Sequence, residues 1–377
     1  MLIPFNKPYF VGTETRYIEE AVRSGKLSGD GIFTRRCEEW LQAHFNAPRV
    51  LLTTSGTDAL ELAALLLELE PGDEVLLPSF TFSSTATAFA LRGARLVFVD
   101  SSPSSPALDA TQLNSLVTSR TRAIVPVHYG GVACDMAAIH AVAEAHDLVV
   151  VEDAAQALGG SFKGQPLGTQ GALGAFSFHE TKNVTAGGEG GMLVVNSLQL
   201  IARAEILREK GTNRAAFFRG EVAKYSWVDI GSSFLPAEIN AAFLWAQLEK
   251  LDFIQQCRQE IWARYFKELQ PLQALGVGLP NIPDYSIQNG HLFYLVCRSL
   301  TERTSLIDFL RKQDVTAIFH YQPLHSSPYY AARHDGRELP WATHYADCLV
   351  RLPLYTELEA SQQQRIIRAV LAFYQVA

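Results

Sequence analysis

Short apolar runs rich in β-branched residues recur along the first half of the chain. Segments with helical periodicity, such as residues 57–70 and 136–146, separate several of them. Strands that alternate with helices predict βαβ units and a mostly parallel sheet, so the fold class is α/β. Runs that are almost entirely apolar are typical of strands covered on both faces. The seven candidate strands are residues 50–53, 74–77, 96–99, 123–127, 148–151, 175–178 and 192–195.

The pattern changes after about residue 230, where strands become fewer and helical segments longer. The chain has 377 residues, which exceeds the usual range of a single hydrophobic core. We therefore expect a large domain over residues 1–247 and a smaller C-terminal α+β domain over residues 248–377. In the second part the sequence predicts a long bent helix over 236–267, strands over 292–297 and 316–319, helices over 304–312 and 359–374, and a surface loop over 326–340.

Composition places the chain among soluble globular enzymes, with 48% apolar and 19% charged residues. The net charge is −7 and no basic stripe is present, so we do not expect a nucleic-acid partner. The five cysteines lack metal-ligand or redox spacing and are interpreted as reduced thiols. The N-terminus has no signal-peptide pattern, and no apolar run is long enough for a membrane span. These features favour a cytoplasmic protein without membrane contact.

An acidic residue, Asp153, follows the apolar run 148–151 and is followed by two alanines and Gln156. A carboxylate at a strand end can pair with a protonated pyridine nitrogen and keep an aromatic cofactor cationic. Gln156 could reach a phenolic oxygen on the same ring. The alternative is that Asp153 simply caps a helix.

One lysine, Lys182, lies among short polar residues just before the glycine-rich stretch 187–191. Desolvation lowers the pKa of a lysine and frees the amine as a nucleophile. Lys182 is therefore the candidate that would hold a cofactor as an imine. A solvated surface lysine is the alternative, because most lysines are exposed. His179, nearby, has no partner at ligand spacing, so we do not expect a metal site.

Residues that could bind a phosphate lie at the start of the helical segment near residue 57. Exposed N–H groups at a helix start bind anions, Gly56 permits a close backbone approach, and Thr57 adds a hydroxyl. Ser177 could supply another hydroxyl from across the site. Helix capping explains the Ser-Gly-Thr sequence equally well.

Aromatic and polar residues supply the remaining candidates. Phe82 follows a strand end and could stack on a planar cofactor, or it could be a core residue like Phe80. In the second domain, His320, Tyr321 and His325 form a dense polar and aromatic cluster that could contact a polar substrate, or form a structural turn.

Taken together, these segments resemble pyridoxal 5'-phosphate (PLP)-dependent aminotransferases of fold type I, the aspartate-aminotransferase-like fold. More narrowly, the chain is similar to the DegT/StrS family of sugar-nucleotide aminotransferases. The matching segments are Thr54-Ser55-Gly56-Thr57, Pro71-Gly72-Asp73-Glu74-Val75, Glu152-Asp153-Ala154-Ala155-Gln156, Ser177-Phe178-His179-Glu180-Thr181-Lys182-Asn183 and Gly187-Gly188-Glu189-Gly190-Gly191.

The resemblance implies a seven-stranded sheet in the large domain, PLP as cofactor, L-glutamate as amino donor and a nucleotide-linked keto sugar as acceptor. The subgroup that it matches best implies dTDP-4-dehydro-6-deoxyglucose as that acceptor. The likeness also extends to residues 25–31, which adds Lys26 to the candidate substrate contacts. The family's dimers share their active sites, so we expect at least a homodimer.

One segment departs from the broader family. Many members carry Gly-Tyr-Asn-Tyr-Arg, whose asparagine reaches the phosphate in the neighbouring subunit's site, whereas this chain has Gly231-Ser232-Ser233-Phe234-Leu235. Ser233 occupies the asparagine's place. Its shorter hydroxyl could touch the phosphate directly or through water.

Three other functions are compatible with parts of the pattern. Related sugar 3-dehydratases replace the lysine with histidine, so the presence of Lys182 disfavours a lyase. A non-catalytic regulator usually carries a DNA-binding module, for which this chain has no basic region. An aminotransferase that acts at another sugar carbon or on another nucleotide differs only in pocket contacts, and the sequence leaves it open.

Overall fold

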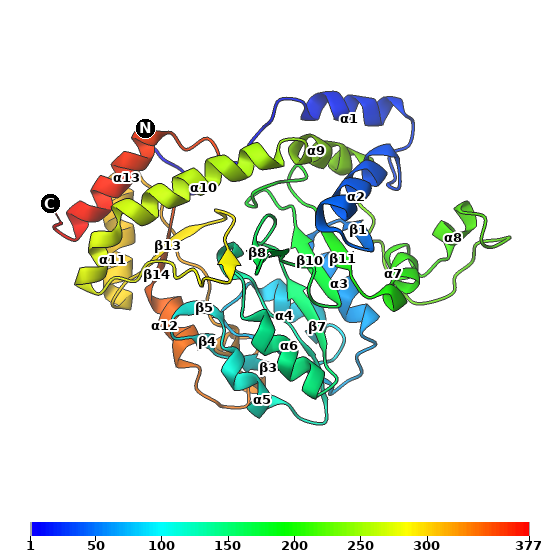
Figure 1. The fold of residues 1–377 in the computed structure, drawn as a ribbon, viewed down its shortest axis with the longest axis horizontal. Helices are drawn as coiled ribbons and strands as arrows, with labels where there is room; N and C mark the ends of the chain where they lie inside the picture. The colour runs from blue at the N-terminus through cyan, green and yellow to red at the C-terminus, as the bar shows by residue number, and fades with distance from the viewer. Residues whose placement is uncertain (1, 377) are drawn as a thin grey trace.

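The computed structural model describes residues 2–376 and contains a seven-stranded sheet between two layers of helices (Figure 1). The strand order is β1-β11-β10-β7-β6-β2-β3, and β11 alone runs against its neighbours in that sheet. The strands are β1 Arg49–Thr53, β2 Glu74–Pro78, β3 Arg95–Val99, β6 Thr121–Ile124, β7 Val149–Asp153, β10 Leu173–Ser177 and β11 Gly191–Val195. All seven predicted strands are present, and the predicted α/β fold is confirmed.

Alternate residues of each central strand face opposite helical layers, as the continuous apolar runs predicted. Val50 and Leu52 belong to one buried cluster, whereas Leu51 belongs to another on the opposite face. The first layer includes α2 Ile32–Phe45, α6 Met136–Ala145 and α9 Glu238–Leu248, and the second includes α3 Gly56–Leu66, α4 Ser83–Ala90, α7 Ile201–Arg208 and α12 Pro340–Cys348.

A third buried cluster forms the core of the C-terminal part of the molecule. Most of its residues come from 261–374, and Ile3 joins them from the N-terminal segment. Its elements are α10 Leu251–Glu268, β13 Phe293–Val296, α11 Leu300–Lys312, β14 Leu349–Leu352 and α13 Ala360–Phe373. We retain a domain boundary at residue 248 as a proposal; it falls at the end of α9, just before α10 (Figure 1).

The remaining elements are short or lie at the periphery. They are α1 Glu14–Arg23, β4 Ser101–Ser102, β5 Ser105–Leu108, α5 Leu113–Leu116, β8 Ser161–Phe162, β9 Gln165–Pro166, α8 Arg214–Phe218 and β12 Ser286–Ile287. Among the described residues, none of the helices combines the length and the apolar character needed to cross a membrane.

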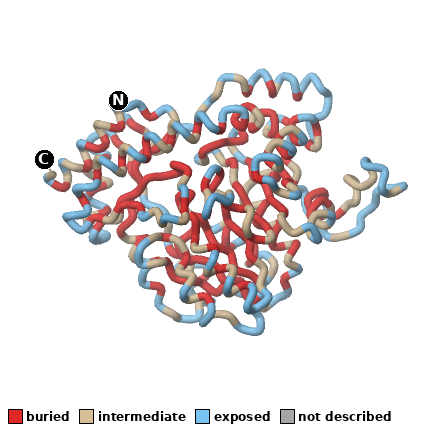
Figure 2. Tube along the Cα trace, viewed as in Figure 1, coloured by how far each residue is buried: buried red, intermediate tan, exposed pale blue. Residues whose placement is uncertain are grey.

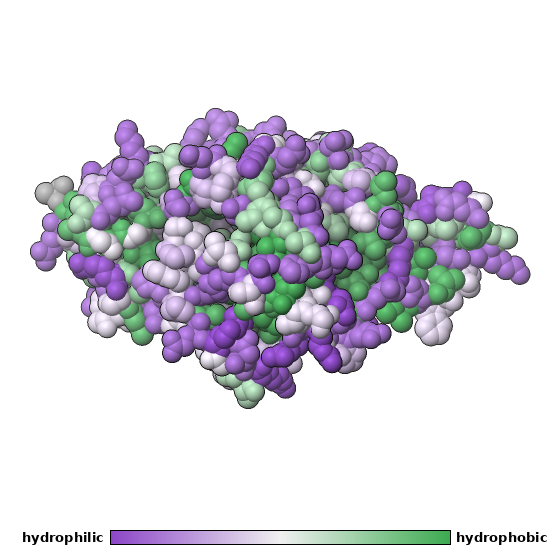
Figure 3. Space-filling model, turned by 60° about the horizontal axis from the view of Figure 1, so that its bottom comes forward, coloured by the Kyte–Doolittle hydropathy of each residue, from purple (hydrophilic) through white to green (hydrophobic). Residues whose placement is uncertain are grey.

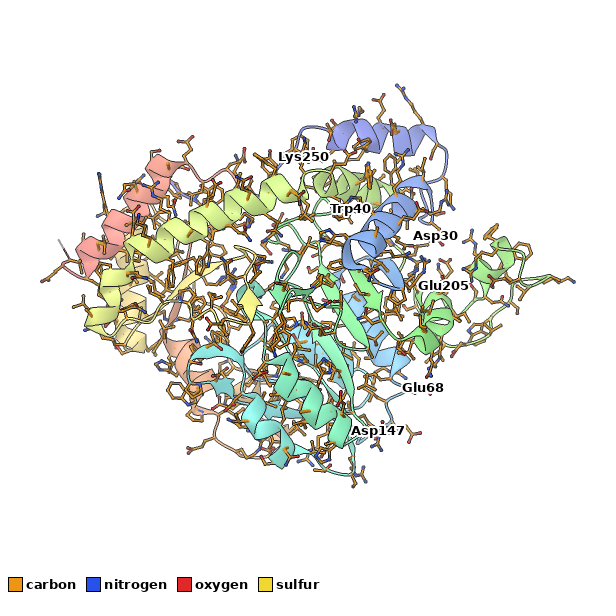
Figure 4. All side chains as sticks on the ribbon, in the orientation of Figure 1. Asp30, Trp40, Glu68, Asp147, Glu205 and Lys250 are labelled. Atoms are coloured by element: carbon orange, nitrogen blue, oxygen red, sulfur yellow. The ribbon has the colours of Figure 1, made fainter. Side chains whose placement is uncertain are left out.

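Two predictions about the C-terminal part were wrong. The expected bent helix over 236–267 is two helices, α9 and α10, which meet at Glu249 and Lys250; Lys250 is labelled at this junction in Figure 4. The expected strand over 316–319 makes only an isolated bridge between Ile318 and Arg351. At the junction of α9 and α10 the apolar pattern continues, and no glycine or proline marks the break.

One segment projects from the rest of the chain. Residues 212–233, which include α8, contain no buried residue and extend away from the sheet (Figures 1 and 2). We call this segment the arm. In Figure 2 the buried residues gather along the sheet and its flanking helices, and the arm carries none of them.

Candidate active site

Asp153 ends the central strand β7 at the carboxyl edge of the sheet, where α/β sheets bind ligands. Its side chain is buried, and the Thr85 hydroxyl donates a hydrogen bond to Oδ2 at 2.7 Å. The N–H of Ala155 donates to Oδ1 at 3.1 Å. A turn rather than a helix follows the strand, so the alternative interpretation of Asp153 as a helix cap is wrong.

The preceding residue, Glu152, points to the other face of the strand and fixes its position. It is fully buried and accepts hydrogen bonds from the N–H groups of Gly168, Gln170 and Gly171. Nε2 of His128 lies 2.8 Å from Glu152 Oε2. Burial alone would raise the pKa of Glu152, but its hydrogen bonds and the nearby imidazole lower it. Sequence reasoning missed this anchor, because its partners are distant in the chain.

Lys182 lies in the turn between β10 and β11 and is partly buried. Desolvation lowers the pKa of its amine from 10.5 to about 8, and the charge of Arg351 adds to this effect. The carboxylate of Asp153 acts in the opposite direction, which places the two groups within electrostatic range. At neutral pH a much larger fraction of this amine is free than in an ordinary lysine.

A small hollow beside Lys182 brings together residues from both sides of the proposed domain boundary. Gln156, Ser177 and Lys182, which the sequence analysis proposed as site residues, precede that boundary, whereas the C-terminal residues in the lining, Asn289 and His291, were not predicted. Its lining consists of Ala155, Gln156, Leu158, Ser177, Lys182, Asn183, Val184, Asn289 and His291.

His291 is the unpredicted residue with the clearest effect on this hollow. It is buried, and its Nδ1 lies 2.9 Å from Oδ1 of Asn183, next to Lys182 in the chain. Desolvation, then the charges of Lys182, Arg351 and Arg258, lower its pKa well below the usual range. His291 is therefore neutral at physiological pH and holds the turn that carries Lys182 in place.

The side chain of Gln156 already has two partners. Its Oε1 accepts from the N–H of Gly130 at 2.6 Å, and its Nε2 donates to the hydroxyl of Tyr321 at 3.1 Å. These bonds hold the amide between the sheet edge and the C-terminal part of the chain.

The start of α3 lies against the ends of β10 and β11. The hydroxyl of Ser55 caps the helix by accepting from the N–H of Asp58 at 3.0 Å. A Cβ atom added to Gly56 would lie 2.7 Å from Cβ of Ser177, and one added to Gly191 would lie 2.3 Å from the carbonyl oxygen of Ser55. Glycine at both positions therefore allows the first turn of α3, with its unpaired N–H groups, to reach the edge of the site.

Two hydroxyls extend this polar edge. Oγ1 of Thr57 lies 2.7 Å from Oγ of Ser84 at the start of α4. Ser177, at the end of β10, borders the same region and lines the hollow.

Two aromatic side chains, Phe82 and Tyr321, lie close together near Gln156. Phe82, at the start of α4, is 57% exposed, and its ring centroid lies 5.9 Å from that of Tyr321. A large exposed ring at a site edge is available for stacking, whereas Phe80 is fully buried, as predicted.

Of the other predicted substrate contacts, His320 lies close to Tyr321, whereas His325 does not line the hollow. Nδ1 of His320 accepts a hydrogen bond from Arg351 at 2.9 Å, next to Tyr321. His325 instead lies against Ser79, with Nδ1 2.7 Å from its hydroxyl, and has no contact with the hollow. Desolvation, then the charges of Arg351 and Lys182, lower the pKa of His320 to about 4, so it stays neutral.

Lys26 and Ser233 are not among the residues that line the hollow beside Lys182. Lys26 is exposed, and its amine donates to the carbonyl oxygen of Asp30 at 2.7 Å. Ser233 is exposed at the end of the arm. The next residue, Phe234, accepts a hydrogen bond from the N–H of Thr54, so the arm returns to the sheet beside the start of α3.

Comparison with known proteins places this geometry in a family. The sequence model of the DegT/DnrJ/EryC1/StrS aminotransferase family matches residues 9–371. The chain is 33% identical to a pleiotropic regulatory protein of Geobacillus stearothermophilus, with 95% of this chain and 94% of that protein aligned. It is 34% identical to the spore coat polysaccharide biosynthesis protein SpsC of Bacillus subtilis, over 98% and 96% of the two chains.

A solved structure shows the same architecture. The putative sugar aminotransferase Spr1654 from Streptococcus pneumoniae, in its PMP form, superposes with a TM-score of 0.91. The match covers 99% of each chain at 26% identity.

Proposed function

Because the chain belongs to the DegT/DnrJ/EryC1/StrS aminotransferase family and is a PLP-dependent aminotransferase, we propose that it transfers the amino group of L-glutamate to a nucleotide-linked keto sugar. The specific reaction that we propose converts dTDP-4-dehydro-6-deoxy-D-glucose to dTDP-4-amino-4,6-dideoxy-D-galactose. Such a product would serve a cell-surface polysaccharide such as enterobacterial common antigen. The main observation in support is that the amine of Lys182, with a pKa of about 8, lies within electrostatic range of the buried Asp153 carboxylate.

The residues around the hollow fit PLP. The first turn of α3 offers free N–H groups, and Gly56, Thr57 and Ser177 leave space and hydroxyls for a phosphate. Phe82 would cover one face of the ring. When bound, PLP supplies an electron sink for the carbon from which a proton is removed.

Two side chains would carry out most of the chemistry. The carboxylate of Asp153 would accept the hydrogen bond of the ring N–H and keep the ring nitrogen protonated; Thr85 already orients this carboxylate. The amine of Lys182 would hold the cofactor at rest. Once displaced by the donor's amine, Lys182 would take a proton from the donor carbon and return it to the cofactor carbon.

Neighbouring side chains would support these two without taking part in proton transfer. Gln156, held by Gly130 and Tyr321, would lie along the edge of the ring, where it could reach the phenolic oxygen. Neutral His320 and Tyr321 would contact the sugar or the donor from the second domain.

We also propose that two copies of the chain share their active sites. The arm carries exposed apolar residues that a single chain leaves uncovered, and some are visible on the projecting segment at the right of Figure 3. In a dimer, Ser233 and Lys26 would act in the partner's site, and His325 would act only if the sugar nucleotide extends to Ser79. The exposed apolar residues of the arm are Phe218, Tyr225, Trp227, Val228 and Ile230.

The decisive experiment is a substrate panel with the purified holoenzyme. With L-glutamate and a set of nucleotide 4-keto and 3-keto sugars, we expect amination of the dTDP-linked 4-keto sugar, identified by mass and NMR. A preference for another nucleotide or for a 3-keto sugar would contradict the specific acceptor and assign a different one. A deoxygenated product would indicate a dehydratase, and no product with any sugar would contradict the proposed function.

A further inference from the structure

A buried amide from the C-terminal part of the chain bonds to both turns that carry proposed cofactor ligands. Asn289 is 1% exposed and lines the hollow beside Lys182. Its Nδ2 donates to the carbonyl oxygens of Gln156 and Leu158, at 2.8 and 2.9 Å. Its own backbone carbonyl accepts from Nδ2 of Asn183 at 3.0 Å. The residue therefore joins the turn after β7 to the turn between β10 and β11.

Among the described residues, these two turns share no direct hydrogen bond. Residues 154–158 follow β7, residues 178–186 carry the lysine, and their bonds to one another pass through side chains of the C-terminal part. Gln255 of α10 forms a second such bridge. Its Oε1 accepts from Nδ2 of Asn183, and its Nε2 donates to the carbonyl oxygen of Leu158. The relative placement of the two turns therefore depends on these two amides.

Two glycines leave the space that the amides occupy. A Cβ atom added to Gly131 would lie 1.9 Å from Oδ1 of Asn289, and one added to Gly159 would lie 2.4 Å from Nε2 of Gln255. A side chain at either position would displace the bridge next to it.

The hydrogen-bonding groups of the Asn289 side chain are used within the protein. An asparagine amide has two N–H donors, and both are taken by the backbone carbonyls of the first turn. Its Oδ1 accepts from the N–H of His291 at 3.0 Å. Asn289 is therefore placed to hold protein groups and has no N–H left for a ligand.

We propose that Asn289, with Gln255 as the second bridge, is a positioning residue that sets the distance between the Asp153 carboxylate and the Lys182 amine. Asp153 ends β7 directly before the first turn, and Lys182 lies in the second. The proposal rests on the proposed roles of these two residues, and not on the identity of the sugar or the donor. A misplacement of about 1 Å can slow a reaction about 100-fold, so a small shift between the turns would let PLP bind without being captured by the amine.

The test is a double-mutant cycle on PLP affinity, measured by fluorescence titration of the cofactor-free proteins. It compares the wild type, Asn289→Ala, Lys182→Ala and the double variant. With the lysine present, Asn289→Ala should weaken PLP binding about tenfold, because the amine no longer meets the cofactor's aldehyde. Without the lysine, the same change should alter the affinity by less than about twofold, because the ring and phosphate contacts need no amine.

The rate of capture gives a second readout. When cofactor-free protein is mixed with PLP in a stopped-flow instrument, the absorbance band of covalently held cofactor should appear about tenfold more slowly in Asn289→Ala. The PLP concentration that gives half of the maximal rate should stay the same. A general loss of stability would not separate these two quantities.

Ser286 provides a matched control in the same segment. It is 7% exposed, and its hydroxyl accepts from the N–H of Ala133 at 2.9 Å, so it also bonds to the part of the chain before residue 248, but to neither turn. Ser286→Ala should lower the temperature of unfolding and leave the capture rate unchanged. If Asn289→Ala fails to fold, Gln255→Ala decides, because this partly exposed bridge should show the same selective loss of capture to a smaller extent.

Other outcomes overturn the proposal. Equal losses of PLP affinity with and without the lysine would make Asn289 a general support of the pocket, and no loss in either background would leave it without a role in capture. If Lys182→Ala itself retains the band of covalently held cofactor, the proposed role of Lys182 fails, and that of Asn289 fails with it. Neither glutamate nor a sugar enters these measurements, so an error in the proposed substrates would leave their result unchanged.

Discussion

At the residue scale, the site depends on two neighbouring acids with different environments. Asp153 faces the ligand side, where a hydroxyl and one N–H orient it, and Glu152 faces the opposite side among three N–H donors and an imidazole. The alternation of side chains along a strand explains this division. The sequence made Asp153 a candidate because it ends an apolar run, but the partners of Glu152 are far away in the chain.

Replacement of Lys182 tests the nucleophile. Lys182→Ala should abolish turnover and the absorbance band of covalently held cofactor, because among residues 2–376 no other lysine lines the hollow. Absorbance measures the state of the cofactor, and circular dichroism measures whether the variant is folded. A variant with wild-type turnover would remove Lys182 from the mechanism.

Replacement of Asp153 tests the ring-nitrogen partner. Asp153→Asn retains the shape and the bond to Thr85 but loses the charge, so PLP should still bind while kcat falls by about 100-fold or more. Steady-state kinetics at saturating PLP measure this effect. Thr85→Val, which removes only the orienting hydroxyl, should cause a smaller loss, and an unchanged rate in Asp153→Asn would contradict the assignment.

The lowered pKa of Lys182 predicts a pH dependence for cofactor uptake. Below pH 8 the amine is protonated, and above it the amine is free, since its pKa falls from 10.5 to about 8. The rate at which the cofactor-free protein takes up PLP should therefore rise with pH up to about 8 and then level off. Stopped-flow absorbance measures this rate, and a rise that continues to pH 10 would indicate an unperturbed lysine.

At the scale of elements, the sequence predicted the strands of the sheet well and the C-terminal part incompletely. The expected strand over 292–297 and helices over 304–312 and 359–374 are present as β13, α11 and α13, whereas the single helix over 236–267 and the strand over 316–319 are not. Strands buried on both faces leave an apolar signature, so β1, β7 and β10 were found within two residues. The break between α9 and α10 carries no glycine or proline, and the pairing of β14 with β13 depends on contacts far apart in sequence. For the same reason His291 could not be assigned to the hollow beforehand.

The close approach of α3 to β11 predicts the effect of a single methyl group. In Gly191→Ala, the new Cβ would lie 2.3 Å from the carbonyl oxygen of Ser55 and would push away the first turn of α3. PLP affinity should fall by about tenfold or more, because the N–H groups at that turn lose their position. Fluorescence titration of the cofactor-free protein measures the affinity.

A glycine outside the site serves as the control for this variant. Gly164 has open space around it but a φ of +80°, so Gly164→Ala should lower stability without changing PLP affinity. Equal losses of PLP affinity in both variants would show that Gly191→Ala acts only through general destabilisation.

At the scale of the whole molecule, the arm and the hollow belong to different regions of one chain. In a dimer that shares its sites, Ser233 would reach the phosphate of the cofactor bound in the partner's site. The sequence suggested a shared site from the resemblance to a dimeric family, from whose usual motif residues 231–235 depart, and the exposure of the arm supports the same proposal.

Disruption of the arm should dissociate the dimer. Trp227 is 79% exposed in the single chain, and Trp227→Asp would place a charge in the proposed interface. Sedimentation should show monomers with reduced activity, whereas Leu300→Asp, at an exposed apolar residue in the second domain, should remain dimeric. A Trp227→Asp protein that stays dimeric would place the interface elsewhere.

The exposure of the arm also affects the fate of a newly made molecule. Until another copy of the chain binds, the arm, residues 212–233, is a long stretch of accessible backbone that a protease can cut. Lone copies should then be degraded faster than paired ones, so the cell would clear surplus subunits without a dedicated signal.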